Sequence, residues 1–162
     1  MLTLWGCTVK EETCNAIGKF AVLWSQFEIV YFKNNYNVKS YERIEVIKSS
    51  SEIDDLISGI KDTLNSYARE TYNVGFTWEE KLCIRKNERN YLETVNSFLN
   101  ERLVQLEAQI KICIFICGRI RNNLLHGFKD IASLDRQKEI FQILEKFLKY
   151  IIENNIIDVN ME

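Results

Sequence analysis

The stretch that decides the predicted fold consists of two consecutive segments, which read Ile110-Lys111-Ile112-Cys113-Ile114-Phe115-Ile116-Cys117-Gly118 and Arg119-Ile120-Arg121-Asn122-Asn123-Leu124-Leu125-His126-Gly127. The first segment is almost entirely apolar, which is typical of a helix that is buried on all sides. The second segment contains two arginines and two asparagines, and it holds the only histidine of the chain. A polar cluster directly after a core segment indicates either a helix end that turns to solvent or a functional site. We expect a site.

Composition predicts one helical domain over residues 1–162. The chain has 46% hydrophobic and 27% charged residues, an ordinary balance for a globular protein of this size. Proline is absent, which favours long helices joined by short polar turns over a sheet protein. The formal net charge is -2, whereas a strong non-specific nucleic-acid binder would be basic. Any nucleic-acid contact must therefore be local or shared across an oligomer.

The five cysteines predict reduced thiols in a cytoplasmic protein, because their number is odd and no Cys-x-x-Cys motif occurs. Cys113 and Cys117 lie four residues apart, so they share one helical face. Together with His126 they suggest a zinc site, but core packing is the preferred interpretation. The N-terminus lacks the basic region of a signal peptide. The apolar run over 103–118 is too short and too charged for a membrane span, since it contains Glu107 and Lys111.

Apolar residues recur at spacings of three and four over most of the chain, which predicts amphipathic helices. The first half is expected to begin with an irregular lead-in over 1–10 and a helix over 11–33, which Thr8 or Thr13 would cap. A short helix over 38–49 follows. The next helix is expected to start at a Ser49–Glu52 capping box and to end at Tyr72, before a connection over 73–77. Within 38–49 the sequence Ile44-Glu45-Val46 also alternates as a strand would. A further short helix is expected after the cap residue Thr77.

In the second half, the pattern predicts a helix over 88–117 with a bend near 107–118, for which Gly118 is the natural hinge. The last helix is expected to start near Ser133 and to stop at Asn154, followed by a tail that frays from Ile156. These elements predict the fold class, an all-α, up-and-down helical bundle of four to five helices. In the first helix, Glu28 lies at the edge of the apolar face, and we expect a solvated flank residue there rather than a group in a cleft.

Three residues of the second segment suit phosphodiester chemistry. Asn122 and His126 are one helical turn apart and therefore lie on one face, and the long side chain of Arg121 can reach the same ligand. Guanidinium is a permanent, forked cation that matches phosphate oxygens, and imidazole can move a proton near neutral pH. An RNA 2′-hydroxyl beside a phosphodiester needs both groups, and the scheme requires no metal and no cofactor.

The sequence Arg121-Asn122-Asn123-Leu124-Leu125-His126 resembles the Arg-Asn-x-x-x-His signature of the HEPN superfamily. The chain length, the helical pattern, the position of the motif before the final helix and the aromatic first helix resemble that superfamily as well. The resemblance implies a HEPN-like bundle that forms a homodimer, with two motifs in one composite active site. It also implies a metal-independent endoribonuclease of a toxin–antitoxin or antiviral defence system, with an antitoxin as a further candidate partner.

Carried over from that resemblance, His126 is the acid/base group, Arg121 binds the phosphate, and Asn122 positions the histidine or the substrate. Arg119 and Lys129 are expected to add RNA contacts, because they lie close to the motif. In HEPN toxins that are paired with a nucleotidyltransferase, a tyrosine is the second residue after the histidine, and here that residue is Phe128. This difference argues against neutralisation by tyrosine modification, but it leaves the nuclease prediction unchanged.

Two alternatives remain open from the sequence. One is a non-catalytic HEPN-like module that binds RNA or a protein, and the other is a purely structural helical bundle.

Overall fold

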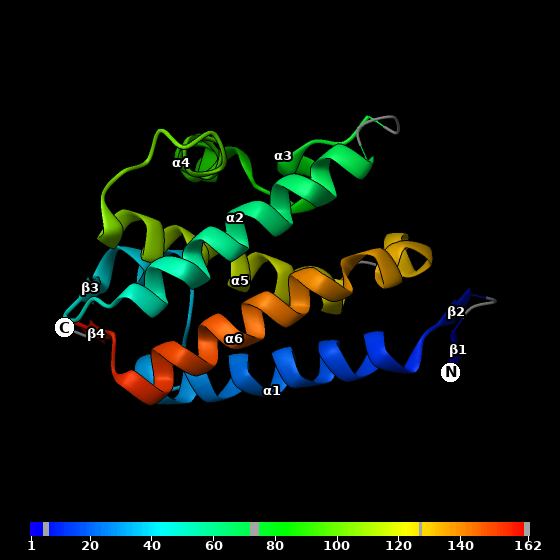
Figure 1. Ribbon diagram of the computed structural model, residues 1–162, viewed down its shortest axis with the longest axis horizontal. Helices are drawn as coiled ribbons and strands as arrows, with labels where there is room; N and C mark the ends of the chain where they lie inside the picture. The colour runs from blue at the N-terminus through cyan, green and yellow to red at the C-terminus, as the bar shows by residue number, and fades with distance from the viewer. Residues whose placement is uncertain (5–6, 72–74, 127, 161–162) are drawn as a thin grey trace.

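The computed structural model describes residues 1–4, 7–71, 75–126 and 128–160, and the side chains of residues 4, 7, 38, 125, 126 and 128–132 lie outside that description. Within the described residues, the fold is an all-α helical bundle with two very small antiparallel sheets, which confirms the predicted fold class (Figure 1). The α-helices are α1 (Glu11–Phe32), α2 (Ser51–Thr71), α3 (Trp78–Lys81), α4 (Arg89–Leu99), α5 (Leu106–His126) and α6 (Lys138–Asn154).

Three long helices form the body of the bundle, and α6 packs between α1 and α2. The contacts between Glu12 and Lys138, and between Tyr31 and the carbonyl of Ile151, show that α1 and α6 run in the same direction. The helix α2 runs the opposite way, because its N-terminal neighbour Ser50 meets Tyr150 at 2.6 Å. In Figure 1, α4 is seen end-on, so it crosses the other long helices.

The core is centred on α5, which contacts α1, α2 and α4. Every residue of the helix from Ile112 to Ile120 is buried, as its nearly continuous apolar sequence predicts. Gly118 lies inside this helix and is not a hinge. A Cβ atom there would approach Cε1 of Tyr36 to 2.9 Å and Cη2 of Trp24 to 3.2 Å. The glycine therefore permits close packing, and the predicted bend near 107–118 is wrong because the break lies at residues 100–105.

Two predictions for the chain ends are wrong. Residues 1–10 contain the antiparallel strands β1 (Leu2–Leu4) and β2 (Cys7–Val9) instead of an irregular lead-in. The C-terminal tail forms β4 (Ile157–Val159), which pairs with β3 (Ile44–Val46). Ile156 and Ile157 are buried, so the tail is held by core packing as well as by backbone hydrogen bonds.

The strand-like alternation at Ile44-Glu45-Val46 was thus the correct alternative, and the only helical part of 38–49 is a 3-10 helix, η1 (Val38–Arg43).

Helix starts are capped by other residues than the sequence suggests. The helix α2 is capped by Ser50, whose hydroxyl accepts from the amide of Ile53, and not by Ser49. The helix α1 has no side-chain cap from its own N-terminus, and neither Thr8 nor Thr13 serves as one. By contrast, Thr77 caps α3 as predicted. The predicted end of α2 at Tyr72 and the connection over 73–74 lie outside the described residues.

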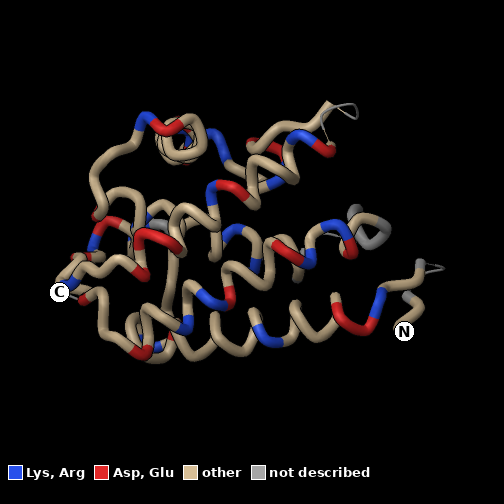
Figure 2. The backbone as a smooth tube through the Cα atoms, in the orientation of Figure 1, with Lys and Arg blue, Asp and Glu red and all other residues tan. Residues whose placement is uncertain are grey.

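No helix in the described part of the chain combines the length and the apolar character needed to cross a bilayer. Figure 2 shows that Lys and Arg positions alternate with Asp and Glu positions along the helices, rather than gathering in separate halves of the molecule. The small net charge of -2 is therefore spread over the chain, and any anion site must be built by local geometry.

Candidate functional site at the end of helix α5

The predicted site residues Arg119, Arg121, Asn122 and His126 lie near the C-terminal end of α5, which ends at His126. Asn122 and His126 are therefore one turn apart on the same side of a regular helix, as expected. The side chain of His126 lies outside the described residues. The same holds for Lys129, whose backbone belongs to the following 3-10 helix, η4 (Phe128–Gln137).

The structure brings Arg121 and Asn122 together. Nη1 of Arg121 donates a hydrogen bond to Oδ1 of Asn122 at 3.1 Å, and both side chains are half-buried. The guanidinium is thereby drawn around the helix toward the face that leads to His126. The ion pairs between described residues join Arg89 to Glu79 and Lys138 to Glu12. No described carboxylate thus neutralises Arg121, whose charge remains available for an anion.

Arg119 has a different environment and a structural task. Its Nε donates to the carbonyl of Leu82 at 2.9 Å and its Nη2 to the carbonyl of Cys83 at 2.7 Å. One turn further along α5, the amide of Asn123 donates to the carbonyl of Lys81. Three successive carbonyl groups at the end of α3 are thus bound to one face of α5. The predicted contact of Arg119 with RNA would require these buried hydrogen bonds to break.

The segment after α3 needs this support because its backbone is unusual. Cys83 has a φ of 50°, in the left-handed region that residues other than glycine adopt at a cost. The amide of Ile84 donates to the carbonyl of Glu79 at 3.0 Å, which closes the turn. Arg119 binds the carbonyl groups of Leu82 and Cys83 in the same turn. These bonds attach the end of α3 to α5, the helix that carries the candidate site.

Cys113 and Cys117 are fully buried core residues, as the interpretation of core packing predicts. Burial raises the pKa of both thiols above its ordinary value, so they remain protonated at neutral pH. In the described part of the chain, no cluster of three or more His, Cys, Asp or Glu side chains could hold a metal ion.

Glu28 accepts a hydrogen bond from the indole of Trp24, so it is a partly buried structural residue rather than a solvated one.

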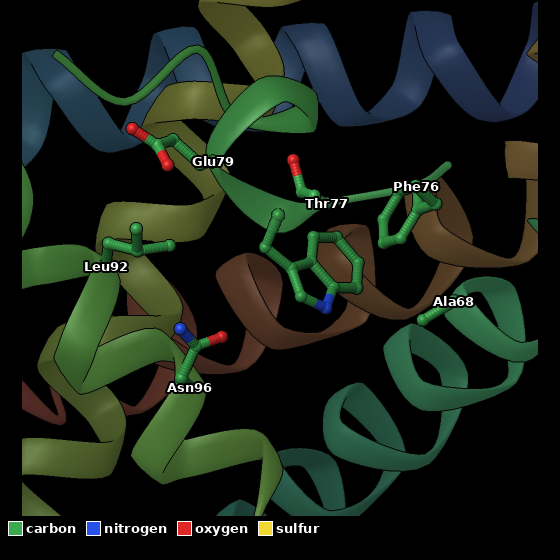
Figure 3. A pocket seen from close by; sticks show the side chains of 7 residues that line it. Ala68, Phe76, Thr77, Glu79, Leu92 and Asn96 are labelled. Carbon is green, nitrogen blue, oxygen red and sulfur yellow. The ribbon is translucent and has the colours of Figure 1, made fainter. Parts of the chain in front are cut away.

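A pocket of about 400 Å³ opens on the other side of α3, and the sequence did not predict it (Figure 3). Figure 3 shows Leu92 and Asn96 projecting from α4, with Phe76 and Thr77 on the segment that enters α3. The pocket is completed by Ala68 of α2, Trp78 and Glu79. The signal in the sequence is the pair Phe76 and Trp78, two aromatic residues on either side of the start of a short helix.

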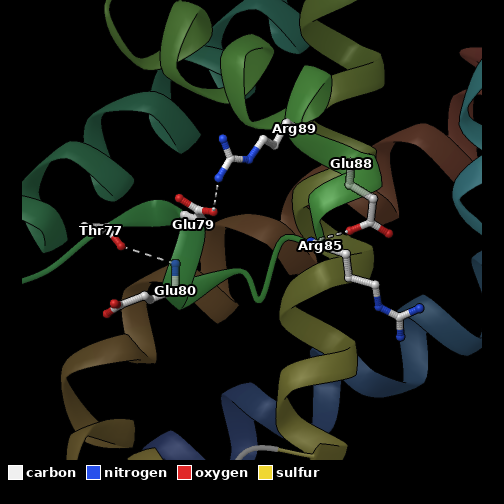
Figure 4. A network of polar contacts seen from close by, with 6 residues as sticks. All are labelled: Thr77, Glu79, Glu80, Arg85, Glu88 and Arg89. Atoms are coloured by element: carbon white, nitrogen blue, oxygen red, sulfur yellow. Dashed lines mark hydrogen bonds and ion pairs between the residues drawn. The ribbon is translucent and has the colours of Figure 1, made fainter.

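Two polar interactions shape the rim of this pocket (Figure 4). Nη2 of Arg89 lies 3.9 Å from Oε1 of Glu79, and both side chains are exposed. The hydroxyl of Thr77 accepts from the amide of Glu80 at 3.3 Å and so caps α3. Glu79 lines the pocket, whereas Arg89 is not part of its lining and is linked to it only through Glu79, in an exposed pair that contributes little to stability.

A comparison of the chain with protein-family models, with curated proteins and with solved structures found no match in any of the three. The functional interpretation therefore depends on the residues and the geometry described above.

Proposed function

We propose that the chain is a metal-independent endoribonuclease of the HEPN type, with Arg121, Asn122 and His126 as its site. The observation that carries the proposal is the hydrogen bond from Arg121 to Asn122 at the end of α5. It draws the guanidinium toward the helix face on which His126 follows Asn122 by one turn. The resemblance of the motif and the helical bundle agree with this assignment. A role as a toxin or an antiphage effector is part of the same proposal.

The chemistry uses the 2′-hydroxyl of the RNA as the nucleophile. The imidazole of His126 accepts the 2′-proton, O2′ forms a bond to phosphorus, and the bond from phosphorus to O5′ breaks. The departing O5′ takes up a proton, which leaves a 2′,3′-cyclic phosphate and a 5′-hydroxyl. Arg121 stabilises the negative charge that develops on the phosphorane oxygens, and Asn122 holds the guanidinium in place.

A homodimer would place two such motifs in one composite active site, and the outer face of α1 suits this contact. On this face the side chains of Val22 and Ile29 are 60% and 62% exposed. The opposite face of α1 is aromatic and buried in the core. A helix that is apolar on both faces favours burial on both. On its buried face, α1 contacts α5 through Trp24 and Gly118.

Charge complementarity supports a second copy of this chain as the partner on that face. The first turn of α1 carries the exposed Glu11, and Lys33 follows its last turn, whereas Glu12 pairs with Lys138 of the same chain. Val22 lies midway between Glu11 and Lys33 in the sequence. Two α1 helices that pack antiparallel around Val22 would therefore bring the acidic end of each copy next to Lys33 of the other, with both helix dipoles opposed.

The experiment that tests the proposed function analyses the products of RNA cleavage. The purified chain is incubated with total cellular RNA in the presence of EDTA, and the new ends are mapped chemically. We expect 2′,3′-cyclic phosphate ends, and we expect a single 2′-deoxy substitution at a mapped site to block cleavage there. Cleavage that is lost in EDTA, or that leaves a 5′-phosphate, would refute the mechanism. RNA binding without any cleavage would favour the non-catalytic module instead.

A further inference from the structure

We propose that the pocket between α2, α3 and α4 binds one unpaired base of the RNA, and that it prefers a base with an exocyclic amino group. The inference rests on the proposed ribonuclease function, and it adds a substrate contact to that site. The pocket volume of about 400 Å³ lies within the range of small-molecule sites.

The aromatic residues of the pocket form a rigid surface for stacking. The rings of Phe76 and Trp78 pack edge to face, with centroids 4.9 Å apart and an interplanar angle of 86°. Both rings also pack against Tyr67, which is buried. Phe76 and Trp78 remain half-exposed, so ring surface stays open to a ligand. Stacking on such rings is the common way in which proteins hold single-stranded bases.

Two polar groups at the edge of the pocket can read the edge of a base. Asn96 is exposed on α4, and its amide can donate and accept hydrogen bonds at the same time. The carboxylate of Glu79 only accepts. An amide of this kind pairs with adenine and a carboxylate with the amino group of cytosine. Uracil has no exocyclic amino group, and its N3–H lies between two carbonyl oxygens, which a carboxylate repels. The pair of groups therefore favours bases with an exocyclic amino group over uracil.

The charge at the rim favours a base of a nucleic acid over an organic cation. Aromatic rings beside a carboxylate also attract cations. Here, however, Nη2 of Arg89 lies 3.9 Å from Oε1 of Glu79, and this guanidinium would repel a cationic ligand. The same guanidinium can bind the phosphate that follows a stacked base. A neutral base with an adjacent phosphate therefore matches Glu79 in the pocket and Arg89 beside it.

The position of α3 connects the pocket to the proposed active site. Thr77 and Trp78, at its N-terminal end, line the pocket. The carbonyl groups of Leu82 and Cys83, at its C-terminal end, bind Arg119 of α5. The four residues of α3 rise only about 6 Å at 1.5 Å per residue, so the pocket and the carbonyl groups that bind Arg119 lie at the two ends of one helical turn. The clamp of Arg119 thus fixes α3, and with it the pocket, to the helix that carries Arg121.

The test measures RNA binding in the full chain carrying His126→Ala, so that cleavage does not interfere. Affinities for labelled oligoadenylate and oligouridylate are measured by fluorescence anisotropy at constant salt. We expect the adenylate to bind more tightly, and Trp78→Ala to weaken its binding about tenfold, because stacking on an aromatic ring contributes about 1–3 kcal/mol per base. Trp78→Phe keeps a ring and should retain most of the affinity. Circular dichroism verifies that each variant is folded.

Asn96→Ala tests the edge contact in a position where folding is not at risk, since the side chain is exposed. We expect it to reduce the preference for adenylate over uridylate several-fold. Asn90→Ala is the control, an exposed residue of the same helix outside the pocket, and it should bind as the parent does. Affinities within twofold of the parent for both Trp78→Ala and Asn96→Ala would overturn the proposal, as would a folded parent that binds neither oligonucleotide. Cleavage is assayed separately, on the chain with His126 intact. If the oligonucleotides bind as expected but that chain does not cleave RNA, the proposed function is refuted while the proposed base pocket stands.

Discussion

At the scale of single residues, Arg119 and Arg121 show that neighbouring arginines of one motif have different tasks. Arg119 is buried and binds the backbone of Leu82 and Cys83, whereas Arg121 is half-buried and bonded to Asn122. The sequence could not separate them, because the partners of Arg119 lie more than 35 residues away in the chain. Spacing alone predicted that Asn122 and His126 lie one turn apart on a helix, and α5 contains both.

This difference makes a prediction about stability. Arg119→Ala leaves the carbonyl groups of Leu82 and Cys83 without their charged donor, and hydrogen bonds to charged groups contribute about 1.5–3 kcal/mol each. Because two such bonds are lost, we expect it to lower the free energy of unfolding by about 3 kcal/mol or more in urea denaturation. Arg121→Ala is the matched control, and it should change stability by less than about 0.5 kcal/mol, as most partly exposed substitutions do. Equal losses for the two variants would contradict the assignment.

Gly118 gives a second prediction at this scale, because a Cβ atom there would press on Tyr36 at 2.9 Å. Overpacking of this kind costs typically about 1–3 kcal/mol, which exceeds the gain of about 1 kcal/mol that alanine brings to a helix interior. Gly118→Ala should therefore lower the thermal unfolding midpoint. Gly18→Ala in α1 is the control, since its Cβ would meet nothing within 4 Å, and it should raise the midpoint. A rise for both variants would show that Tyr36 moves aside without cost.

At the scale of elements, the sequence predicted which segments are helical better than where they begin and end. The periodicity of apolar residues is local, so α1 and α6 were visible in it. Caps and pairings are not local. The helix α1 is capped by Asp135, whose Oδ1 accepts from the amide of Lys10 at 3.0 Å and from the hydroxyl of Thr13 at 2.6 Å. The strand β4 was missed for the same reason, because its partner β3 lies over 100 residues earlier.

Asp135 also gives the bundle a pH dependence. The hydrogen bond from Thr13 and the amide of Lys10 lower the pKa of this carboxyl below its ordinary value of 3.8. Because the pKa is lower in the folded state than in the unfolded state, the ionised carboxylate stabilises the folded state above pH 3.8. This stabilisation is lost as the pH falls below 3.8 and through the pKa of the folded state. We expect Asp135→Asn to lower the unfolding midpoint at pH 7, with the difference from the parent closing in acid. Asp62→Asn, on the exposed side of α2, is the control. A difference that stays constant down to pH 2 would contradict the role of the charge.

At the scale of the whole molecule, the absence of proline and the helical periodicity were sufficient to predict an all-α bundle. They were not sufficient to predict the crossing of α4, because the loop over 100–105 that permits it lacks strong turn residues such as Gly and Pro. The pocket beside α4 was missed for the same reason, since it forms only where α4 crosses α2 and α3.

The proposed homodimer makes a prediction that belongs to this scale. Val22→Glu places a charge in the middle of the exposed apolar face of α1, so it should convert a dimer into a monomer when the molar mass is measured by light scattering after gel filtration. Ile47→Glu is the control, because Ile47 is 54% exposed but lies outside α1, and it should leave the dimer intact. A parent that is monomeric at all concentrations, or a Val22→Glu variant that remains a dimer, would rule out this surface.

The most direct test of the central claim compares the single-turnover rate of RNA cleavage in the parent, His126→Ala, Arg121→Ala and Arg121→Lys. We expect His126→Ala to lose about 10²–10⁴-fold in rate, as the removal of a general base does. Arg121→Ala should lose about 10²–10³-fold, as the removal of a donor to the developing oxyanion does, with all variants folded. Arg121→Lys should fall in between, because it keeps the charge and loses the fork. Cleavage at the parental rate by both alanine variants would show that the end of α5 is not the active site.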